Sequence, residues 1–382
     1  MNLGSCHNIA DFRALAKRRL PWPVFDYIDG AADDEVTRQR NRSSYDDCDL
    51  VPRVLAGVDS VDMGTTLFGR ALAMPLFLSP TALQRLFHWQ GERAVLRAAA
   101  DAGTCAGISS LATISLAEAG ALTDAPKLFQ LYVHKDEGLN RAMLAAARAA
   151  RFDAVALTVD TIVGGNRERC LKSGFTSPPR FTARNLASYL AKPAWGLNYL
   201  LREPFSLPNL ATHVAEGSSV PRSVADYFST MLDQSLDWRR AEAIRRQWDG
   251  PFCLKGIMAV EDARRAVDIG ATAIMVSNHG GRQLDGSRAP FDALAEIVDA
   301  VGDRVEVICD GGITRGTHVL KALSVGARAC SGGRLYLYAL AAAGEAGVAR
   351  AIGLLRAEIE RGMKLMGAQS LADLSRANLR WR

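Results

Sequence analysis

The sequence predicts an α/β protein that folds as a (β/α)8 TIM barrel, and three observations lead to this prediction. Short apolar runs of strand length recur along the chain, each followed by a helix-like segment rich in Ala, Leu, Glu and Arg. Eight such runs are present, which suits a closed barrel of parallel strands covered by helices. Polar side chains gather where these runs end, and in a barrel all eight ends meet on the face that carries the active site.

The predicted strands are regularly spaced, with one exception. Six of the seven distances between successive strand starts are about 20 to 33 residues, which suits one strand and one helix. The fourth and fifth strands start about 100 residues apart, so we expect a long insertion there, over residues 167–245. In order, the strands are "MPLFLSP" (74–80), "TCAGISS" (104–110), "KLFQLYV" (127–133), "AVALTVD" (154–160), "FCLKGI" (252–257), "AIMVSNH" (273–279), "VEVICDGG" (305–312) and "ARACSGG" (327–333).

The residues ahead of the first strand are expected to form an N-terminal helical extension, and residues 1–382 a single domain. A doubly wound parallel sheet is the alternative fold. No G-x-G-x-x-G motif follows the first strand, which disfavours that alternative.

The composition is that of an ordinary globular protein, with 382 residues, 48% of them hydrophobic, and a net charge of +5. The Lys and Arg residues are scattered, so nucleic acid is not expected as a partner. The first residues lack an apolar core, so we expect no secretory signal, and no run reaches the ~18 apolar residues of a membrane span. We expect the seven cysteines, which form no C-x-x-C pair, to be reduced thiols of a cytoplasmic protein.

Three strand ends carry the clearest chemical signals. The stretch "SNHGGRQLDG" (277–286) presents a base, His279, and a cation, Arg282, around two glycines. The turns "CDGGITRG" and "SGGR" place glycines and an arginine, Arg334, where barrels commonly bind phosphate. Lys255 lies inside the apolar run "FCLKGI", and since a buried ammonium without a partner is costly, it must face an anion or act chemically.

These stretches resemble one known family. "SNHGGRQLDG", "LKGIMAVEDA", "FQLYVHKD", "LTVD", "DGGITRG" and the N-terminal "VFDYIDGAADDEVTRQRN" are similar, in order and spacing, to the FMN-dependent α-hydroxy acid dehydrogenases and oxidases. That family includes L-lactate dehydrogenase, mandelate dehydrogenase and glycolate oxidase. The resemblance implies an FMN-bound barrel that oxidises an L-2-hydroxy acid, lactate or a similar compound first, to the 2-oxo acid. Electrons would pass to a quinone or cytochrome; an (S)-mandelate-type dehydrogenase and an oxygen-using oxidase are the alternatives within the family.

The resemblance also implies roles for individual residues. His279 would be the catalytic base and Asp160 would orient its imidazole, while Tyr132 would lie near the substrate hydroxyl. Arg282 would bind the substrate carboxylate through its planar guanidinium. Tyr27 and Arg167 would complete the substrate site.

For the cofactor, the resemblance implies that Lys255 lies beside flavin N1 and O2, where its charge favours the reduced flavin. No metal is expected. The other predicted FMN contacts are Ser79, Pro80, Thr81, Ala82, Ser109, Gln130, Thr158, Ser277, Asp310, Gly311, Gly312, Arg315, Gly333 and Arg334.

The chain departs from the family pattern at three places. Thr314 precedes Arg315, where the family often has a second basic residue, so one contact near the ribityl phosphate is in doubt. "GRLYLYALA" stands where the family often has G-R-P. Leu111 stands where glycolate oxidases carry a bulky Trp, and together with Ala82 it suggests a pocket wall for lactate or somewhat larger side chains.

The sequence leaves alternatives open for the role of the insertion and for the electron acceptor. Residues 178–206 mix aromatic residues with Arg and Lys, which is typical of a segment on a membrane surface, but an active-site lid or a subunit contact explains it equally well. No haem-binding sequence precedes the flavin domain, so we expect no fused cytochrome, and family members are commonly homotetramers. Outside the family, the rivals are an aldolase with Lys255 as a Schiff-base lysine and a barrel kept as a non-catalytic scaffold.

Overall fold

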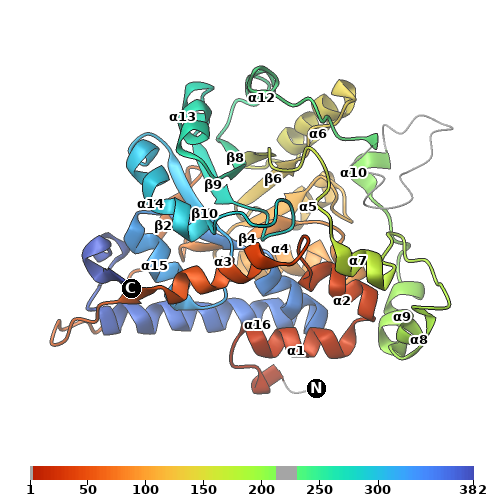
Figure 1. The fold of residues 1–382 in the computed structure, drawn as a ribbon, viewed down its shortest axis with the longest axis horizontal. Coiled ribbons are helices and arrows are strands. Elements are labelled where there is room, and N and C mark those ends of the chain that lie inside the picture. Colours follow the sequence, from red (N-terminus) through yellow and green to blue (C-terminus); the bar gives the residue numbers. More distant parts are fainter. Residues whose placement is uncertain (1–2, 212–229) are drawn as a thin grey trace.

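A computed structural model describes residues 3–211 and 230–382. Its centre is a set of eight parallel strands, each overlapping one predicted strand: β4 (Leu76–Thr81), β5 (Ala106–Ser109), β6 (Lys127–Leu131), β7 (Ala154–Thr158), β8 (Phe252–Ile257), β9 (Ala273–Ser277), β10 (Glu306–Asp310) and β11 (Ala329–Gly332). They close into a barrel in the order β10-β11-β4-β5-β6-β7-β8-β9 (Figure 1). The predicted TIM barrel is therefore confirmed.

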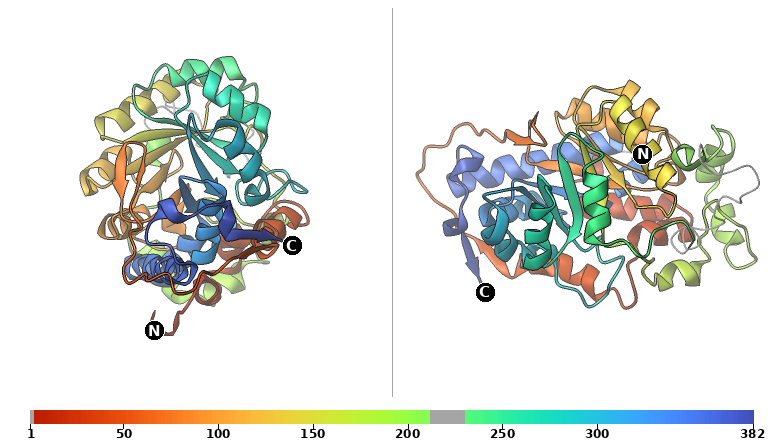
Figure 2. Two further views of the ribbon diagram at one scale, coloured as in Figure 1. Left: turned by 90° about the vertical axis from the view of Figure 1, so that its left-hand side faces the viewer. Right: turned by 90° about the horizontal axis from the view of Figure 1, so that it is seen from above.

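Helices surround the barrel and explain why its strands are apolar on both faces (Figure 2). Several helices begin at capping residues: the Ser115 side chain accepts from Glu118 N at 3.0 Å, and the Asp136 carboxylate accepts from Gly138 N at 2.7 Å. The covering helices are α4 (Glu92–Asp101), α5 (Leu116–Leu122), α6 (Glu137–Ala149), α13 (Val260–Asp268), α14 (Pro290–Val301), α15 (Gly316–Val325) and α16 (Arg334–Met366).

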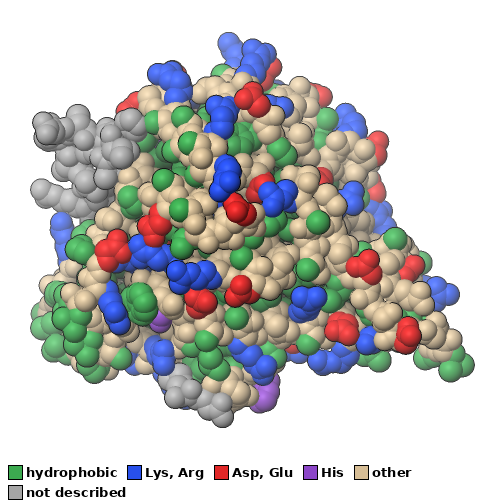
Figure 3. Space-filling view, turned by 180° about the vertical axis from the view of Figure 1, so that it is seen from behind, with side chains coloured by type: hydrophobic (Ala, Val, Ile, Leu, Met, Phe, Trp, Pro, Cys, Tyr) green, Lys and Arg blue, Asp and Glu red, His purple; other side chains and the backbone are tan. Residues whose placement is uncertain are grey.

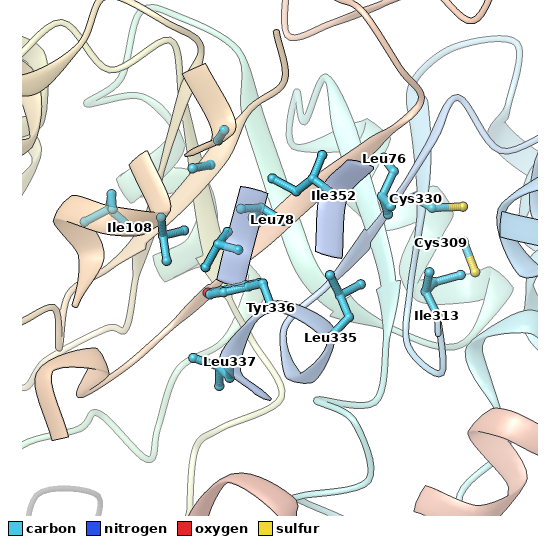
Figure 4. Close-up of a cluster of buried hydrophobic side chains, with 14 of the residues drawn as sticks. Leu76, Leu78, Ile108, Cys309, Ile313, Cys330, Leu335, Tyr336, Leu337 and Ile352 are labelled. Carbon is cyan, nitrogen blue, oxygen red and sulfur yellow. The ribbon is translucent and has the colours of Figure 1, made fainter. Parts of the chain in front are cut away.

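The core lies between the strands and these helices. Figure 4 shows one part of it, where Leu76 and Leu78 of β4 share a buried cluster with Tyr336 and Ile352 of α16. Among the described residues, α16 alone has the length and composition of a membrane span. However, 61% of its most apolar window is buried, and its backbone leaves helical geometry at Gly344, so it is a core helix. The seven cysteines are thiols, and six of them are buried, as expected.

A hairpin closes the amino-terminal end of the barrel. It is formed by β2 (Thr65–Leu67) and β3 (Arg70–Leu72), which pair antiparallel. Phe68 between them is buried with the inward side chains Phe77 and Met275, and its N–H donates to the Glu306 carboxylate at 3.0 Å. The opposite, carboxyl-terminal end is therefore the one open to a ligand.

The predicted N-terminal helical extension consists of α1 (Ile9–Arg19), α2 (Trp22–Asp29) and α3 (Val36–Asp46). Helix α1 packs against α16, and α3 runs beside the barrel (Figure 1). A short strand after α3, β1 (Cys48–Leu50), pairs antiparallel with β12 (Leu379–Trp381), which ties the C-terminal end of the chain to the segment that follows α3. Single 3-10 turns lie at Leu3–Ser5, Gln84–Leu86, Leu371–Asp373 and Arg376–Asn378.

The long insertion between β7 and β8 carries short helices joined by irregular segments where the structure describes it; residues 212–229 of the predicted 167–245 segment lie outside the described residues. Two of its aromatic residues face the barrel, whereas Phe181 is exposed. Tyr189 and Trp195 are buried, and the Trp195 indole N–H donates to Leu86 O at 2.7 Å, so these rings anchor the insertion to the barrel. The helices are α7 (Glu168–Ser173), α8 (Leu186–Leu190), α9 (Pro193–Leu200), α10 (Pro208–Ala211) and α12 (Trp238–Arg245).

Candidate active site

A cavity of about 770 Å³ opens at the carboxyl ends of the strands, a size typical of sites for small ligands and cofactors. Five predicted site residues, Ser109, Gln130, Thr158, Asp160 and Ser277, are not among its lining residues. The predicted residues that line it are Tyr27, Ser79, Pro80, Thr81, Ala82, Tyr132, Arg167, Lys255, His279, Arg282, Asp310, Gly311, Gly312, Arg315, Gly333 and Arg334, and Leu111 lines it too.

His279 and Asp160 form a pair at the edge of this cavity. Asp160 follows β7, and its carboxylate lies 3.1 Å from His279 Nδ1. A proton on Nδ1 donated to that carboxylate leaves Nε2 as an acceptor, and the Tyr132 hydroxyl lies 3.5 Å from Nε2. The His279 side chain is 22% exposed, so a ligand in the cavity can reach the ring. A base oriented by a carboxylate can take a proton from a bound substrate.

The two glycines of "SNHGGRQLDG" give His279 its position. The backbone φ angles of His279, Gly280 and Gly281 are 57°, 68° and 74°, the left-handed region that glycine adopts at little cost and histidine rarely visits. The His279 N–H donates to Ser277 Oγ at 3.2 Å, which supports the turn. A Cβ on Gly281 would lie 2.7 Å from Arg38 N, so the turn also needs glycine to pass beneath α3.

Two arginines converge on Tyr27 in the same cavity. The guanidinium carbons of Arg282 and Arg167 lie 4.9 and 5.8 Å from the centre of the Tyr27 ring. Arg282 Nη1 donates to the carbonyls of Tyr27, at 2.6 Å, and Gly30, at 3.1 Å, which fixes its direction. Burial, together with the nearby charge of Arg167, lowers the pKa of Arg282. Two cations this close favour an anionic ligand between them.

Lys255 has a partner that the sequence analysis did not predict. Its ammonium forms an ion pair with the Asp310 carboxylate and donates to Ser277 Oγ at 2.9 Å. Burial raises the pKa of Asp310, but the charge of Lys255 and the hydrogen bonds from Lys255, Ser79 and Ser331 together outweigh burial and hold that pKa at about 2. Burial likewise lowers the pKa of Lys255, and Asp310 outweighs it and raises that pKa. A Schiff-base lysine needs a neutral amine, so this pair disfavours the aldolase alternative.

Two buried polar groups at the strand ends fit a bound flavin. Ser109 donates to Gln130 Oε1 at 2.7 Å, whereas Gln130 Nε2 and Thr158 Oγ1 are buried and have no hydrogen-bond partner within the described parts of the chain. Buried polar groups without a partner are costly and rare. Thr158 lies opposite Lys255 in the register of β7 and β8. An amide donor, a hydroxyl and a cation suit the polar edge of the predicted isoalloxazine ring.

The glycine turn after β10 is tightly built. A Cβ on Gly312, at φ 72°, would lie 1.7 Å from Asn41 O, so only glycine fits there. Gly311 O accepts from the Tyr45 hydroxyl at 2.9 Å, and the Tyr45 ring stacks flat on His318 with ring centres 4.4 Å apart. Residues of α3 and α15 therefore hold the back of the turn.

The two arginines predicted to bind phosphate have protein partners. Arg334 donates to the carbonyls of Ile28, Gly280 and Gly30 at 3.0, 2.7 and 2.7 Å, which leaves two of its five N–H groups for a ligand. Arg315 pairs with Glu358 of α16 at 3.1 Å. Since Glu358 also accepts from Gly316 N at 2.7 Å, its carboxylate occupies the N-terminus of α15. A phosphate at this end of the cavity would share Arg315 with Glu358.

The sequence analysis missed the residues that position the catalytic loops. Asn278 and Asn41 exchange amide hydrogen bonds at 2.7 and 2.8 Å and tie the turn after β9 to α3. Gln283 Nε2 donates to the carbonyls of Asp160, at 2.9 Å, and Val163, at 2.8 Å, and so ties the loops after β7 and β9 together. Asn278 and Gln283 both lie in the motif around His279, but their partners, the Asn41 side chain and the carbonyls of Asp160 and Val163, are distant in sequence.

A second missed group is a buried carboxylate in the stretch "DYIDG". Asp29 accepts from Arg13, Arg38 and Arg169 and from the Tyr338 hydroxyl, and its side chain is fully buried. Burial raises the pKa of Asp29, but these partners, Arg13 first, outweigh burial and hold it well below its usual range. The network joins α1, α2, α3, α7 and α16 behind Tyr27.

Comparisons with known proteins show the family to which the chain belongs. A family model described as FMN-dependent dehydrogenase matches residues 16–381. The chain is 42% identical over 371 residues to an L-lactate oxidase of Nostoc sp., covering 96% of each chain. It is 41% identical over 366 residues to an L-lactate dehydrogenase of Caulobacter vibrioides, covering 96% of this chain and 95% of that one.

Solved structures give the same result. The crystal structure of the monotopic membrane protein (S)-mandelate dehydrogenase matches with a TM-score of 0.92 and 32% identity, covering 99% of this chain and 100% of that chain. A crystal structure of mandelate oxidase matches with a TM-score of 0.85 and 36% identity, covering 99% of each chain.

Proposed function

Because the chain belongs to the FMN-dependent dehydrogenase family, whose relatives act on α-hydroxy acids, we propose that it oxidises an L-2-hydroxy acid to the 2-oxo acid, with lactate as its first substrate. FMN is its cofactor. The observation that supports the proposal most is the grouping of one oriented base and two cations on one cavity. His279 provides the base, and Arg282 and Arg167 provide the cations.

In this proposal the chain binds, orients and deprotonates the substrate. Arg282 and Arg167 hold the substrate carboxylate, since guanidinium groups match its geometry. His279 Nε2 takes a proton from the substrate, and Asp160 on Nδ1 offsets the charge of the resulting imidazolium. The Tyr132 hydroxyl, 3.5 Å from Nε2, is positioned to contact the substrate hydroxyl. Bound FMN supplies the two-electron acceptor.

We assign the flavin to the floor of the cavity. Gln130 Nε2 and Thr158 Oγ1 would meet its polar edge, because that contact would satisfy two buried groups. Lys255 would lie near the same edge, opposite Thr158. The turns at Gly311–Gly312 and Gly333, with Arg315 and Arg334, would hold the phosphate end.

The wall of the cavity supports a small or medium substrate side chain. Leu111 and Ala82 both line it, and neither carries a large ring. Relatives named for lactate and a structural neighbour named for mandelate fit this range. Lactate is the first choice because the two relatives described above, at 42% and 41% identity, carry its name.

For the electron acceptor we propose a membrane quinone. Leucines of α8, α9 and the residues that follow are strongly exposed, with Leu190 at 71%, Leu200 at 71% and Leu201 at 75%. Figure 3 shows hydrophobic side chains gathered at the lower left, the end of the molecule that carries α8 and α9, beside Lys and Arg. Exposed apolar surface with basic residues is typical of a membrane-surface segment. A structural neighbour is described as a monotopic membrane protein.

The variant His279→Gln tests the assigned base. It keeps a hydrogen-bonding side chain of similar length but cannot act as a base near neutral pH. We expect the purified variant to retain FMN and to be bleached by dithionite, while its reduction by L-lactate slows by at least about a thousandfold. Stopped-flow absorbance of the flavin measures this directly. Reduction by L-lactate at the parent rate would show that His279 is not the base.

A further inference from the structure

Asp310 is the meeting point of side chains from five neighbouring barrel strands. Its carboxylate pairs with Lys255 of β8 and accepts hydrogen bonds from Ser277 of β9 at 2.8 Å and Ser331 of β11 at 2.7 Å. Ser79 of β4 donates to the same carboxylate. The side chains of Lys255 and Asp310 are only 6% and 9% exposed, although both border the cavity. The floor therefore carries a cation and its counter-charge side by side.

Lys255 has a charged partner, whereas the arginines in the cavity that donate to carbonyls have neutral partners. Arg282 donates to the carbonyls of Tyr27 and Gly30, and these neutral groups leave its charge intact. Asp310, by contrast, is a full negative charge in contact with the ammonium of Lys255. The electric fields of the Lys255 ammonium and the Asp310 carboxylate largely cancel at distances longer than that between the two groups. Water screens these charges only weakly because both groups are buried.

The serines adjust how strongly Asp310 acts. Each hydroxyl that donates to the carboxylate stabilises its charge and offsets part of its field. Ser331 is fully buried and its oxygen lies 2.9 Å from the Ser79 oxygen, so this hydroxyl is fixed in place. The positive potential at the cavity floor is therefore the balance of one ammonium, one carboxylate and three hydroxyls.

We propose that Asp310 is a positioning residue that sets how much of the positive charge of Lys255 the bound flavin experiences, and thereby sets the reduction potential of the flavin. The inference deepens the proposed function and rests on its placement of Lys255 at the flavin edge. Reduction places negative charge on the flavin, which an ammonium stabilises and a nearby carboxylate opposes. The Asp310 carboxylate therefore keeps the reduction potential of the flavin below the value that Lys255 alone would give.

The test is the midpoint potential of bound FMN in Asp310→Asn, measured by slow enzymatic reduction with a reference dye. The amide has nearly the shape of the carboxylate but no charge. The charge of Asp160, which also raises the pKa of Lys255, remains in this variant and favours the protonated form of Lys255. We expect the reduction equilibrium to shift toward reduced flavin by at least tenfold, a rise of about 30 mV for a two-electron couple.

In a second, independent variant the midpoint potential of bound FMN is expected to change in the opposite direction. Ser331→Ala removes one hydroxyl from the carboxylate, strengthens its field, and is expected to lower the potential. Asp46→Asn is the matched control, since the Asp46 carboxylate borders the same cavity but is exposed to water. The midpoint potential of FMN in this variant should equal that of the parent.

An unchanged or lowered potential in Asp310→Asn would overturn the inference. So would weaker FMN binding with an unchanged potential, because Asp310 would then act as a direct ligand of the cofactor. If Asp310→Asn fails to fold, a potential in Ser331→Ala at or above that of the parent overturns it. None of these measurements needs substrate, so a protein that ignores every 2-hydroxy acid would refute the proposed function while still testing Asp310.

Discussion

His279 and Lys255 border the same cavity, yet their surroundings suit them to different tasks. His279 is in contact with one carboxylate through Nδ1, which leaves Nε2 directed to the ligand. Lys255 is almost completely buried and paired with Asp310, which holds it protonated. One residue is therefore equipped to move a proton, and the other supplies a permanent charge.

A histidine outside the reaction gives a prediction at the residue scale. His318 is 5% exposed and stacks on Tyr45, and burial lowers its pKa to about 4. A histidine whose folded pKa lies below its unfolded value of about 6.5 stabilises the fold fully above pH 6.5 and loses that contribution as the pH falls toward 4. From pH 7 to pH 5 the parent should lose about 1 to 2 kcal/mol relative to His318→Phe, which keeps the stack but cannot titrate.

Urea unfolding of both proteins at the two pH values measures this difference. Other groups titrate equally in parent and variant, so their contributions cancel. A stability difference that does not change with pH would mean that the pKa of His318 is the same in the folded and the unfolded protein, which contradicts this prediction.

At the scale of elements, the residues that we propose as catalytic depend on two loops that touch each other. The loop after β7 carries Asp160 and Arg167, and the loop after β9 carries His279 and Arg282. Gln283 joins them through two donated hydrogen bonds. The close approach is also visible at Gly165, where a Cβ would lie 2.2 Å from Arg282 O.

Replacing Gln283 with Leu tests this connection. The side chain keeps its volume but loses the two donated hydrogen bonds and a third that Gln283 Oε1 accepts from Gly165 N at 3.3 Å, each contributing about 0.5 to 1.5 kcal/mol. We therefore expect flavin reduction by substrate to slow about tenfold or more. Hydrogen exchange at residues 160–166 should become faster in the variant. Leu284→Ala, at a neighbouring side chain that is 75% exposed, is the control and should change neither quantity. Unaltered exchange in Gln283→Leu would show that the loops are held by other contacts.

The strands and most cavity residues could be predicted because they depend on local sequence. Each apolar run with a polar end produced one barrel strand, and closure of the barrel brought those ends together. The pairings across the barrel could not be predicted. Lys255 and Asp310 are far apart in sequence, and the contact of Glu358 with Arg315 depends on how α16 lies against α15. Such pairs are fixed by tertiary packing, which no local pattern encodes.

At the scale of the whole molecule, the insertion presents a surface that the barrel does not cover. The prediction relied on its aromatic residues, but Tyr189 and Trp195 face inward and the exposed apolar surface consists mainly of leucines. Periodicity in such short helices does not reveal which face meets the barrel, so the segment could be identified but its outer face could not.

We expect the protein to float with vesicles that contain anionic phospholipid. The triple variant Leu190→Ser, Leu200→Ser, Leu201→Ser should bind these vesicles at least tenfold more weakly, because burying one leucine side chain in the membrane contributes about 1.5 to 3 kcal/mol to binding. Leu365→Ser, which alters a 64% exposed leucine of α16, should float like the parent. A parent protein that stays at the bottom of the gradient would contradict the membrane proposal and leave the barrel chemistry unaffected.

The most direct test of the central claim is an absorption spectrum of the purified protein before and after anaerobic addition of L-lactate, with D-lactate as the matched control. We predict a flavin spectrum that L-lactate bleaches and D-lactate does not. A flavin that remains oxidised with L-lactate, with mandelate and with longer L-2-hydroxy acids would contradict the proposed reaction.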